Sequence, residues 1–135
     1  FLERLQRITD DYAGGVSGFY ELNAERLLTA RRELARLAIQ IDRVTAADPH
    51  ELLAAHEAFD RLEVARVMVE HLLYREETRW PGFQSRLDFP ARNDLRWLLF
   101  VNSVYDRDRG QIQIFERPYL QRVSGERYQP GKREE

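Results

Sequence analysis

Charged side chains are densest in the stretch Arg75–Trp80, which reads Arg-Glu-Glu-Thr-Arg-Trp, and more follow at Arg86, Asp88, Arg92 and Asp94. A guanidinium group forms two parallel hydrogen bonds with a carboxylate, a phosphate or a sulfate. The cluster therefore has two interpretations. It forms a surface ion-pair network that holds a long loop in place, or Arg79 or Arg86 faces an anionic ligand or a cofactor held by another domain. Spacing alone does not separate the two.

A further hypothesis is a small enzyme that uses carboxylates as general acid or base. The candidates are Glu76, Glu77 and Asp88, and at least one of them needs a raised pKa in an enclosed pocket. The sequence contains no Gly-x-Ser-x-Gly, phosphate-binding loop or His-Glu-x-x-His motif, and no Gly-x-Gly-x-x-Gly fingerprint. The motifs therefore point to no catalytic residue.

Metal chemistry has little support in the sequence. There is no cysteine, which excludes disulfides, thiolate zinc sites and iron–sulfur ligation within this chain. The histidines are His50, His56 and His71. The last two would lie about 22 Å apart along one helix axis. We therefore expect no metal site.

The elements that position the cluster are predicted to be helical before it. Apolar residues of the first segment share one face from Leu2 to about Tyr12, and Gly14-Gly15 ends that helix. A second helix is expected from an N-cap at Asn23 to about Val44. Its apolar stripe consists of Leu27, Leu28, Leu34, Leu37, Ile41 and Val44.

The third helix has the strongest start signal. Asp48 offers an N-cap acid, Pro49 suits the first helical position, and Glu51 completes a capping box. The apolar pattern then continues to about Arg75. The predicted fold class is mainly α, a three-helix bundle in which an antiparallel pair of long helices joins a short N-terminal helix (residues 1–78).

The pattern changes after this helix. The prolines and glycine in Arg79–Gly82 and at Pro90 predict an irregular segment over residues 79–95. Trp97–Tyr105 and Gln111–Phe115 are rich in aromatic and β-branched residues and flank a turn, which predicts a C-terminal β-hairpin over residues 96–118. We expect a single domain over residues 1–123 and a disordered tail over residues 124–135.

The overall composition excludes some classes of partner. Lys+Arg total 21 against Asp+Glu 23, a net charge of -2, which argues against a nucleic-acid partner. No apolar run approaches the roughly 20 residues that span a bilayer, and no signal peptide is visible, so we expect a cytoplasmic location. The chain opens Phe1-Leu2-Glu3-Arg4-Leu5, without Met and already in helical rhythm. We therefore expect it to be a piece of a longer protein.

Several segments resemble the α subunits of dissimilatory adenylylsulfate reductases. Leu73–Phe83, with its Glu-Glu-Thr-Arg-Trp-Pro-Gly string, resembles the segment after their long helix. Asp11–Gly15, His50–Leu53 and the Phe100–Asp106 stretch, continuing through residues 115–119, resemble further parts of them in the same order. Arg86–Asp94 is similar to the corresponding ending in the wider superfamily of fumarate reductase and succinate dehydrogenase flavoproteins.

The resemblance implies a parent subunit with an FAD-binding domain, a capping domain and this helical C-terminal domain. It also implies a ferredoxin-like β subunit whose iron–sulfur clusters carry electrons. The principal FAD and substrate residues of the family lie in the other domains, so this chain is expected to be inactive alone. The residues that we single out as candidate contacts with another domain or partner subunit are Arg75, Glu77, Arg79, Trp80, Arg86 and Asp88.

Three hypotheses thus remain. A docking and stabilising domain of an oxidoreductase subunit, of the adenylylsulfate reductase or the fumarate reductase kind, predicts an exposed apolar surface on the isolated chain. A stand-alone helical interaction module predicts a polar exterior. The carboxylate enzyme predicts a raised carboxyl pKa.

Overall fold

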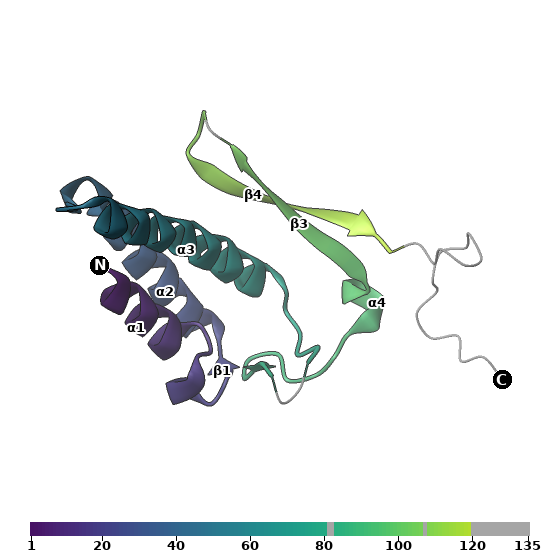
Figure 1. The fold of residues 1–135 in the computed structure, drawn as a ribbon. Coiled ribbons are helices and arrows are strands. Elements are labelled where there is room, and N and C mark those ends of the chain that lie inside the picture. The colour runs from purple at the N-terminus through teal and green to yellow at the C-terminus, as the bar shows by residue number, and fades with distance from the viewer. Residues whose placement is uncertain (81–82, 107, 120–135) are drawn as a thin grey trace.

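The computed structural model describes residues 1–80, 83–106 and 108–119. The protein is mainly helical, as predicted, and carries a two-stranded antiparallel sheet. Three helices lie side by side, and the two-stranded sheet lies over the C-terminal half of the longest one (Figure 1). The tail predicted to be disordered, residues 124–135, lies outside the described residues. The main elements are α1 (Leu2–Tyr12), α2 (Ala24–Ala38), α3 (Pro49–Tyr74), α4 (Asp94–Trp97), β3 (Leu99–Asp106) and β4 (Gln111–Pro118).

Helix α1 has the predicted bounds, and Leu5 and Ile8 are its buried residues. The two glycines that follow are each required. Gly14 has φ +76°, a conformation that favours glycine. A Cβ on Gly15 would lie 2.4 Å from the Cα of Asp10. The chain therefore turns sharply enough here to bring the next segment back against α1.

Helix α2 begins as predicted but ends earlier. The Asn23 side chain caps it by accepting a hydrogen bond from the Arg26 N–H at 2.9 Å. The predicted end near Val44 is wrong, because the α-helix stops at Ala38 and a 3₁₀ turn spans Ile41–Arg43. Ile41 still packs against the core from that turn. The apolar spacing therefore continued past the helix and concealed its end.

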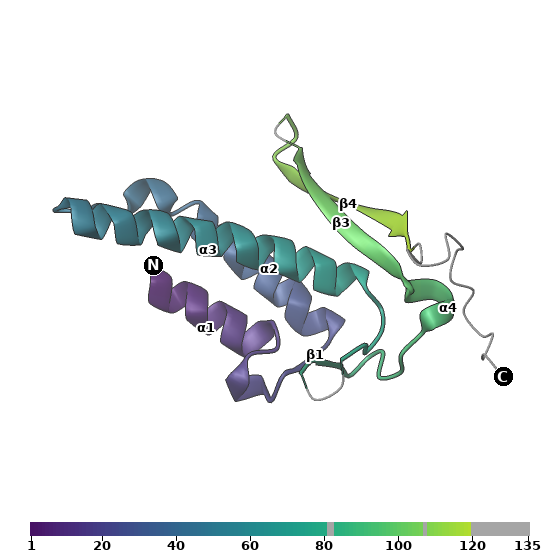
Figure 2. The same cartoon turned by 45° about the vertical axis from the view of Figure 1, so that its right-hand side comes forward.

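Helix α3 starts with the predicted cap. The Asp48 carboxylate accepts from the Glu51 N–H at 2.8 Å, and the Glu51 carboxylate accepts from the Ala47 N–H at 2.7 Å. Arg31, at the middle of α2, pairs with Glu70 near the end of α3 at 3.7 Å. Figure 2 shows that the two helices run antiparallel.

The core lies where the three helices meet. Burying each large aliphatic side chain there contributes about 1.5–3 kcal/mol to folding. The segment between α1 and α2 adds Leu22, which is fully buried. The fully buried large side chains are Leu22, Leu27, Leu34, Leu37, Leu62 and Val69.

The segment predicted to be irregular contains a short strand. β2 (Ser85–Arg86) pairs in parallel with β1 (Glu21–Leu22), with Ser85 N–H donating to Tyr20 O at 3.0 Å and Leu87 N–H to Leu22 O at 2.8 Å. Sequence reasoning missed it because a two-residue strand carries no periodicity. The pairing fastens the chain after α3 to the loop after α1.

The antiparallel strands pair from Leu99↔Pro118 to Asp106↔Gln111. The prediction that Trp97 begins a strand is wrong. Trp97 ends the short helix α4, whose cap is the Asn93 side chain, and it is 5% exposed. Aromatic residues are common in strands, so the sequence pattern does not distinguish Trp97 from the strand that follows, whereas its ring is buried with an edge against Tyr74 at 5.7 Å between centroids.

Candidate functional site

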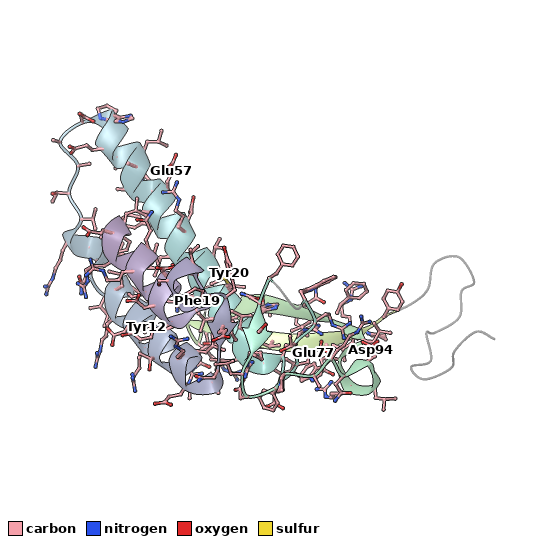
Figure 3. The ribbon with its side chains drawn as sticks, turned by 90° about the horizontal axis from the view of Figure 1, so that it is seen from below. Tyr12, Phe19, Tyr20, Glu57, Glu77 and Asp94 are labelled. Carbon is pink, nitrogen blue, oxygen red and sulfur yellow. The ribbon has the colours of Figure 1, made fainter. Side chains whose placement is uncertain are left out.

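The Glu77 carboxylate is the centre of the charged cluster. Its side chain is fully buried and accepts hydrogen bonds from Arg75 Nη1 at 2.7 Å and from Arg79 Nε at 2.6 Å. The backbone N–H of Asn93 donates to it at 3.0 Å. Arg79 also reaches Asp94 at 3.0 Å. Figure 3 labels Glu77 and Asp94, which lie close together and are joined by Arg79.

The pKa of Glu77 lies below its usual value. Burial alone would raise the pKa, because it disfavours the charged form. Hydrogen bonds from Arg79, from the Asn93 N–H and from Arg75 outweigh that effect and lower it. Glu77 is therefore a permanently charged anchor at neutral pH.

Arg86 and Asp88 form the second half of the network. Arg86 is 4% exposed, and its guanidinium makes a two-pronged pair with Asp88 at 2.8 Å for both bonds. Its remaining Nη1 donates to Leu72 O and to Arg75 O. A side-chain hydrogen bond from Arg86 lowers the pKa of Asp88. The guanidinium thereby satisfies carbonyl groups at the C-terminal end of α3, which otherwise lack partners.

The carboxylate-enzyme hypothesis needs a raised pKa, and Glu77 and Asp88 show the opposite shift. Both carboxylates are held by arginines, so neither has the character of a general acid. The contacts agree with an ion-pair network that holds the segment after α3, but the expected surface position is wrong for its centre, because the Glu77 and Arg86 side chains are buried. Thr78 adds to it, because its hydroxyl oxygen accepts from the Arg86 N–H at 2.9 Å and its hydroxyl donates to Phe89 O at 2.9 Å.

The same network holds the sheet. Arg75 donates to Trp97 O at 2.8 Å and to Leu99 O at 3.1 Å. On β4, Glu116 accepts from the Tyr74 hydroxyl at 2.9 Å and also pairs with Arg96. A two-stranded sheet is marginal in water by itself. These bonds to the end of α3 therefore fix where it stands.

Of the six candidate contact residues, Trp80 differs from the other five. Arg75, Glu77, Arg79, Arg86 and Asp88 all have partners inside the chain. Trp80 is 68% exposed. The neighbouring Pro81 and Gly82, part of the string that carries the resemblance, lie outside the described residues.

Large apolar side chains are exposed on several elements. The most exposed are Phe19 at 83%, Leu95 at 81% and Phe83 at 78%. An open groove of about 1040 Å³ also runs along α1 and α3, beside the loop that carries Tyr20. Exposed apolar patches on soluble proteins commonly mark surfaces that a partner covers. The stand-alone module predicted a polar exterior, and the surface disagrees with that prediction.

Within residues 1–80, 83–106 and 108–119, no helix is long and apolar enough to cross a membrane. The same residues contain no group of three or more His, Cys, Asp or Glu side chains that could hold a metal ion.

Sequence reasoning missed the backbone N–H of Asn93 as a Glu77 partner, because a backbone donor leaves no sequence signal. It also missed the exposed Phe19-Tyr20 pair, although two aromatic residues in a loop after Gly14-Gly15 were visible.

Comparison with known proteins defines the class. The family model of the fumarate reductase flavoprotein C-terminal region matches residues 3–135, and the chain belongs to this family. The adenylylsulfate reductase α subunit of Megalodesulfovibrio gigas is 39% identical over 121 residues, which are 90% of this chain and 18% of that subunit. The chain thus spans about a fifth of the length of this relative.

Solved structures agree with the sequence match. The adenylylsulfate reductase of Archaeoglobus fulgidus has a TM-score of 0.86 and 40% identity, over 88% of this chain and 18% of that one. A structure described as adenosine-5-phosphosulfate reductase in complex with sulfite gives the same values. The quinol fumarate reductase of E. coli, with a TM-score of 0.72 and 22% identity over 95% of this chain and 24% of that one, shares the fold. The resemblance seen in the sequence is therefore confirmed.

Proposed function

We propose that this chain is the C-terminal docking and stabilising domain of an FAD-dependent oxidoreductase subunit that resembles the adenylylsulfate reductase α subunit. In this proposal residues 1–123 form the domain, a three-helix bundle that carries a β-hairpin. The observation that carries it is the exposed apolar surface, with Phe19 and Phe83 more than three-quarters exposed. A domain separated from a covering neighbour is expected to show such a surface.

The Glu77 and Arg86 network supports the docking role. It fastens the segment after α3 to α2 and to the sheet, so that Trp80 is held on a fixed support. Rigid aromatic residues on a fixed scaffold are the usual anchors of protein interfaces. We propose Trp80 as a direct contact and Arg75, Glu77, Arg79, Arg86 and Asp88 as the residues that position it and border the interface.

The parent reaction follows from the relatives named above. We propose the two-electron interconversion of adenylylsulfate with AMP and sulfite, in which the bond between sulfur and the AMP phosphate oxygen is broken or formed. FAD would be held by the preceding domains, and an iron–sulfur β subunit would carry the electrons. This chain supplies no catalytic group to the reaction. We expect the assembly to be cytoplasmic.

A second candidate function is the same domain in a fumarate reductase or succinate dehydrogenase-like subunit. It is favoured by the Arg86–Asp94 string, which is similar to that superfamily and which supplies two bidentate arginine pairs, Arg86–Asp88 and Arg92–Asp94. The stand-alone module has no comparable support.

The full-length parent, co-expressed with whatever ferredoxin-like protein is encoded beside it, tests the proposal. Reduction of an artificial acceptor would be followed with AMP plus sulfite and, separately, with succinate. Rapid reduction that requires both AMP and sulfite is the expected result. Turnover with succinate alone would favour the second candidate, and a parent that binds no flavin would contradict both.

A further inference from the structure

Phe19 and Tyr20 are consecutive residues with left-handed backbones. Their φ angles are +54° and +60°, and among the described non-glycine residues no others have positive φ. L-residues with bulky side chains rarely adopt this conformation, because Cβ crowds the following carbonyl oxygen. Such strain persists only where surrounding structure enforces it, and it gathers at binding and functional sites.

Hydrogen bonds of its backbone and of the Ser17 side chain hold the loop that carries the pair in place. The Asp10 carboxylate accepts from both the N–H and the hydroxyl of Ser17, at 3.1 and 2.6 Å. The Tyr20 N–H donates to Gly15 O at 3.1 Å, and Tyr20 O accepts from the Ser85 N–H at 3.0 Å. The left-handed conformation of Phe19 is therefore a fixed feature of the loop.

The Phe19 side chain makes little contact within the chain, so packing there does not offset the backbone strain. It is 83% exposed, and Val16 beside it is 70% exposed. Phe83, two residues before the Ser85 that pairs with Tyr20 O, is 78% exposed. Figure 3 shows Phe19 and Tyr20 together at the loop beyond the end of α1. The loop thus exposes aromatic side chains to solvent. We call Phe19 and Tyr20, together with the neighbouring Val16, the aromatic knob.

The knob continues into the groove along α1 and α3. Val16 and Tyr20 are among the residues that line it, together with the buried Ala13 and Ala65 and the partly buried Met68. The exposed charged residues Asp60 and Arg61 line it as well. An apolar floor with a charged rim is the usual anatomy of a protein interface.

We propose that the aromatic knob and this groove are the face on which the preceding FAD-bearing part of the same subunit docks. The inference rests on the proposed function and names the docking face for it. One observation and one physical argument favour this occupant over a transient partner. The matched relatives are about five times longer than this chain, so most of such a subunit lies outside it. A covalently joined neighbour is always present, so its contacts offset the backbone strain and cover the exposed aromatic side chains permanently.

The sheet offers a weaker alternative. Its outward face carries Phe100 and Phe115, but the ring of Tyr119 already packs on Phe100 at 5.9 Å between centroids. Its backbone shows no comparable strain, because β3 and β4 have regular pairing along their whole length. The knob is therefore the better anchor for a permanent contact.

Photocrosslinking in the full-length subunit tests the proposal. The photoreactive amino acid p-benzoylphenylalanine would replace Phe19 and, as a matched control, the 76% exposed Ile39 at the other end of α2. After irradiation, mass spectrometry should find cross-links from position 19 to residues that precede this chain in the same polypeptide. Position 39 should give none to that region. Cross-links from position 19 to the iron–sulfur subunit or to a second copy, or their absence, would overturn the proposal.

A second measurement does not need the unnatural residue. Phe19→Ser and Ile39→Ser both replace exposed side chains, so both variants should fold. Loss of an interface anchor should raise the undocked population, and hence the rate of protease cleavage between the two parts, about tenfold for Phe19→Ser. Ile39→Ser should leave that rate unchanged, and equal rates would overturn the proposal. A subunit that cross-links as expected but binds no flavin would leave the docking face standing and remove the proposed function.

Discussion

The side chain of Asp88 accepts a hydrogen bond from the backbone N–H of Ala24 at 2.9 Å, across 64 positions of the sequence. Ala24 is the first residue of α2, where N–H groups have no partner within the helix and favour negative charge. The same carboxylate holds the buried guanidinium of Arg86. One acid thus joins the start of α2, the segment after α3 and, through Arg86, the end of α3.

Replacing Asp88 should therefore lower the free energy of unfolding substantially. Asp88→Ala leaves the Arg86 guanidinium buried without its counter-ion, and breaking a pair of this kind costs about 3 kcal/mol. Urea denaturation of the chain measures the free energy of unfolding. Glu57→Ala is the matched control, because it removes the exposed pair with Arg61 and should cost less than about 0.5 kcal/mol. Equal losses in the two variants would show that the Asp88 contacts contribute little.

The free energy of unfolding should depend on pH through the ionisation of Glu77. Its folded pKa lies below the ordinary value of 4.5, so its contribution is complete above that pH and is lost as pH falls through the folded pKa. Unfolding free energy measured at several pH values below 4.5 should fall more steeply for the natural chain than for Glu77→Gln. Glu57→Gln, at an exposed glutamate that pairs with Arg61, is the matched control variant. An unchanged slope in Glu77→Gln would mean that Glu77 titrates as an ordinary glutamate.

Gly15 should tolerate no side chain. The Cβ of Gly15→Ala would meet Asp10 backbone atoms at 2.4 and 2.9 Å, which cannot move as a side chain does. We expect a loss of about 2 kcal/mol of unfolding free energy. Gly18→Ala in the same loop should change it by less than about 0.5 kcal/mol, since its Cβ would meet nothing closer than 3.7 Å. Thermal unfolding of the two variants in parallel makes the comparison.

The substitution Phe19→Asn should have opposite effects on the stability of the isolated chain and on docking in the full-length subunit. Asparagine accepts the left-handed backbone more readily than phenylalanine, so Phe19→Asn should stabilise the chain by itself by up to about 1 kcal/mol. The same change should loosen the full-length subunit, because the anchor is gone. Ile39→Asn relieves no strain, since Ile39 has φ −64°, and should do neither. A loss of stability in the isolated Phe19→Asn chain would contradict the strain argument.

The sequence predicted the helical part well because amphipathic periodicity and capping residues are local signals. Asn23 and Asp48 mark their helix starts directly, whereas the end of α2 was hidden because Ile41 keeps its apolar position from a 3₁₀ turn. The charged cluster was found from its composition. Its geometry was not, because the Asp88–Ala24 and Arg75–Leu99 bonds depend on tertiary placement. The strain at Phe19 has no sequence signal beyond its neighbouring glycines.

In the proposed function this domain docks on the flavin-bearing part of its subunit and stabilises it. The most direct test is the temperature at which the full-length subunit releases FAD, followed by flavin fluorescence, compared with a subunit that lacks residues 1–123. We predict release at a distinctly lower temperature in the truncated subunit, and recovery when the 135-residue chain is added in excess, as mass action requires. Release at the same temperature with and without the domain would contradict the account.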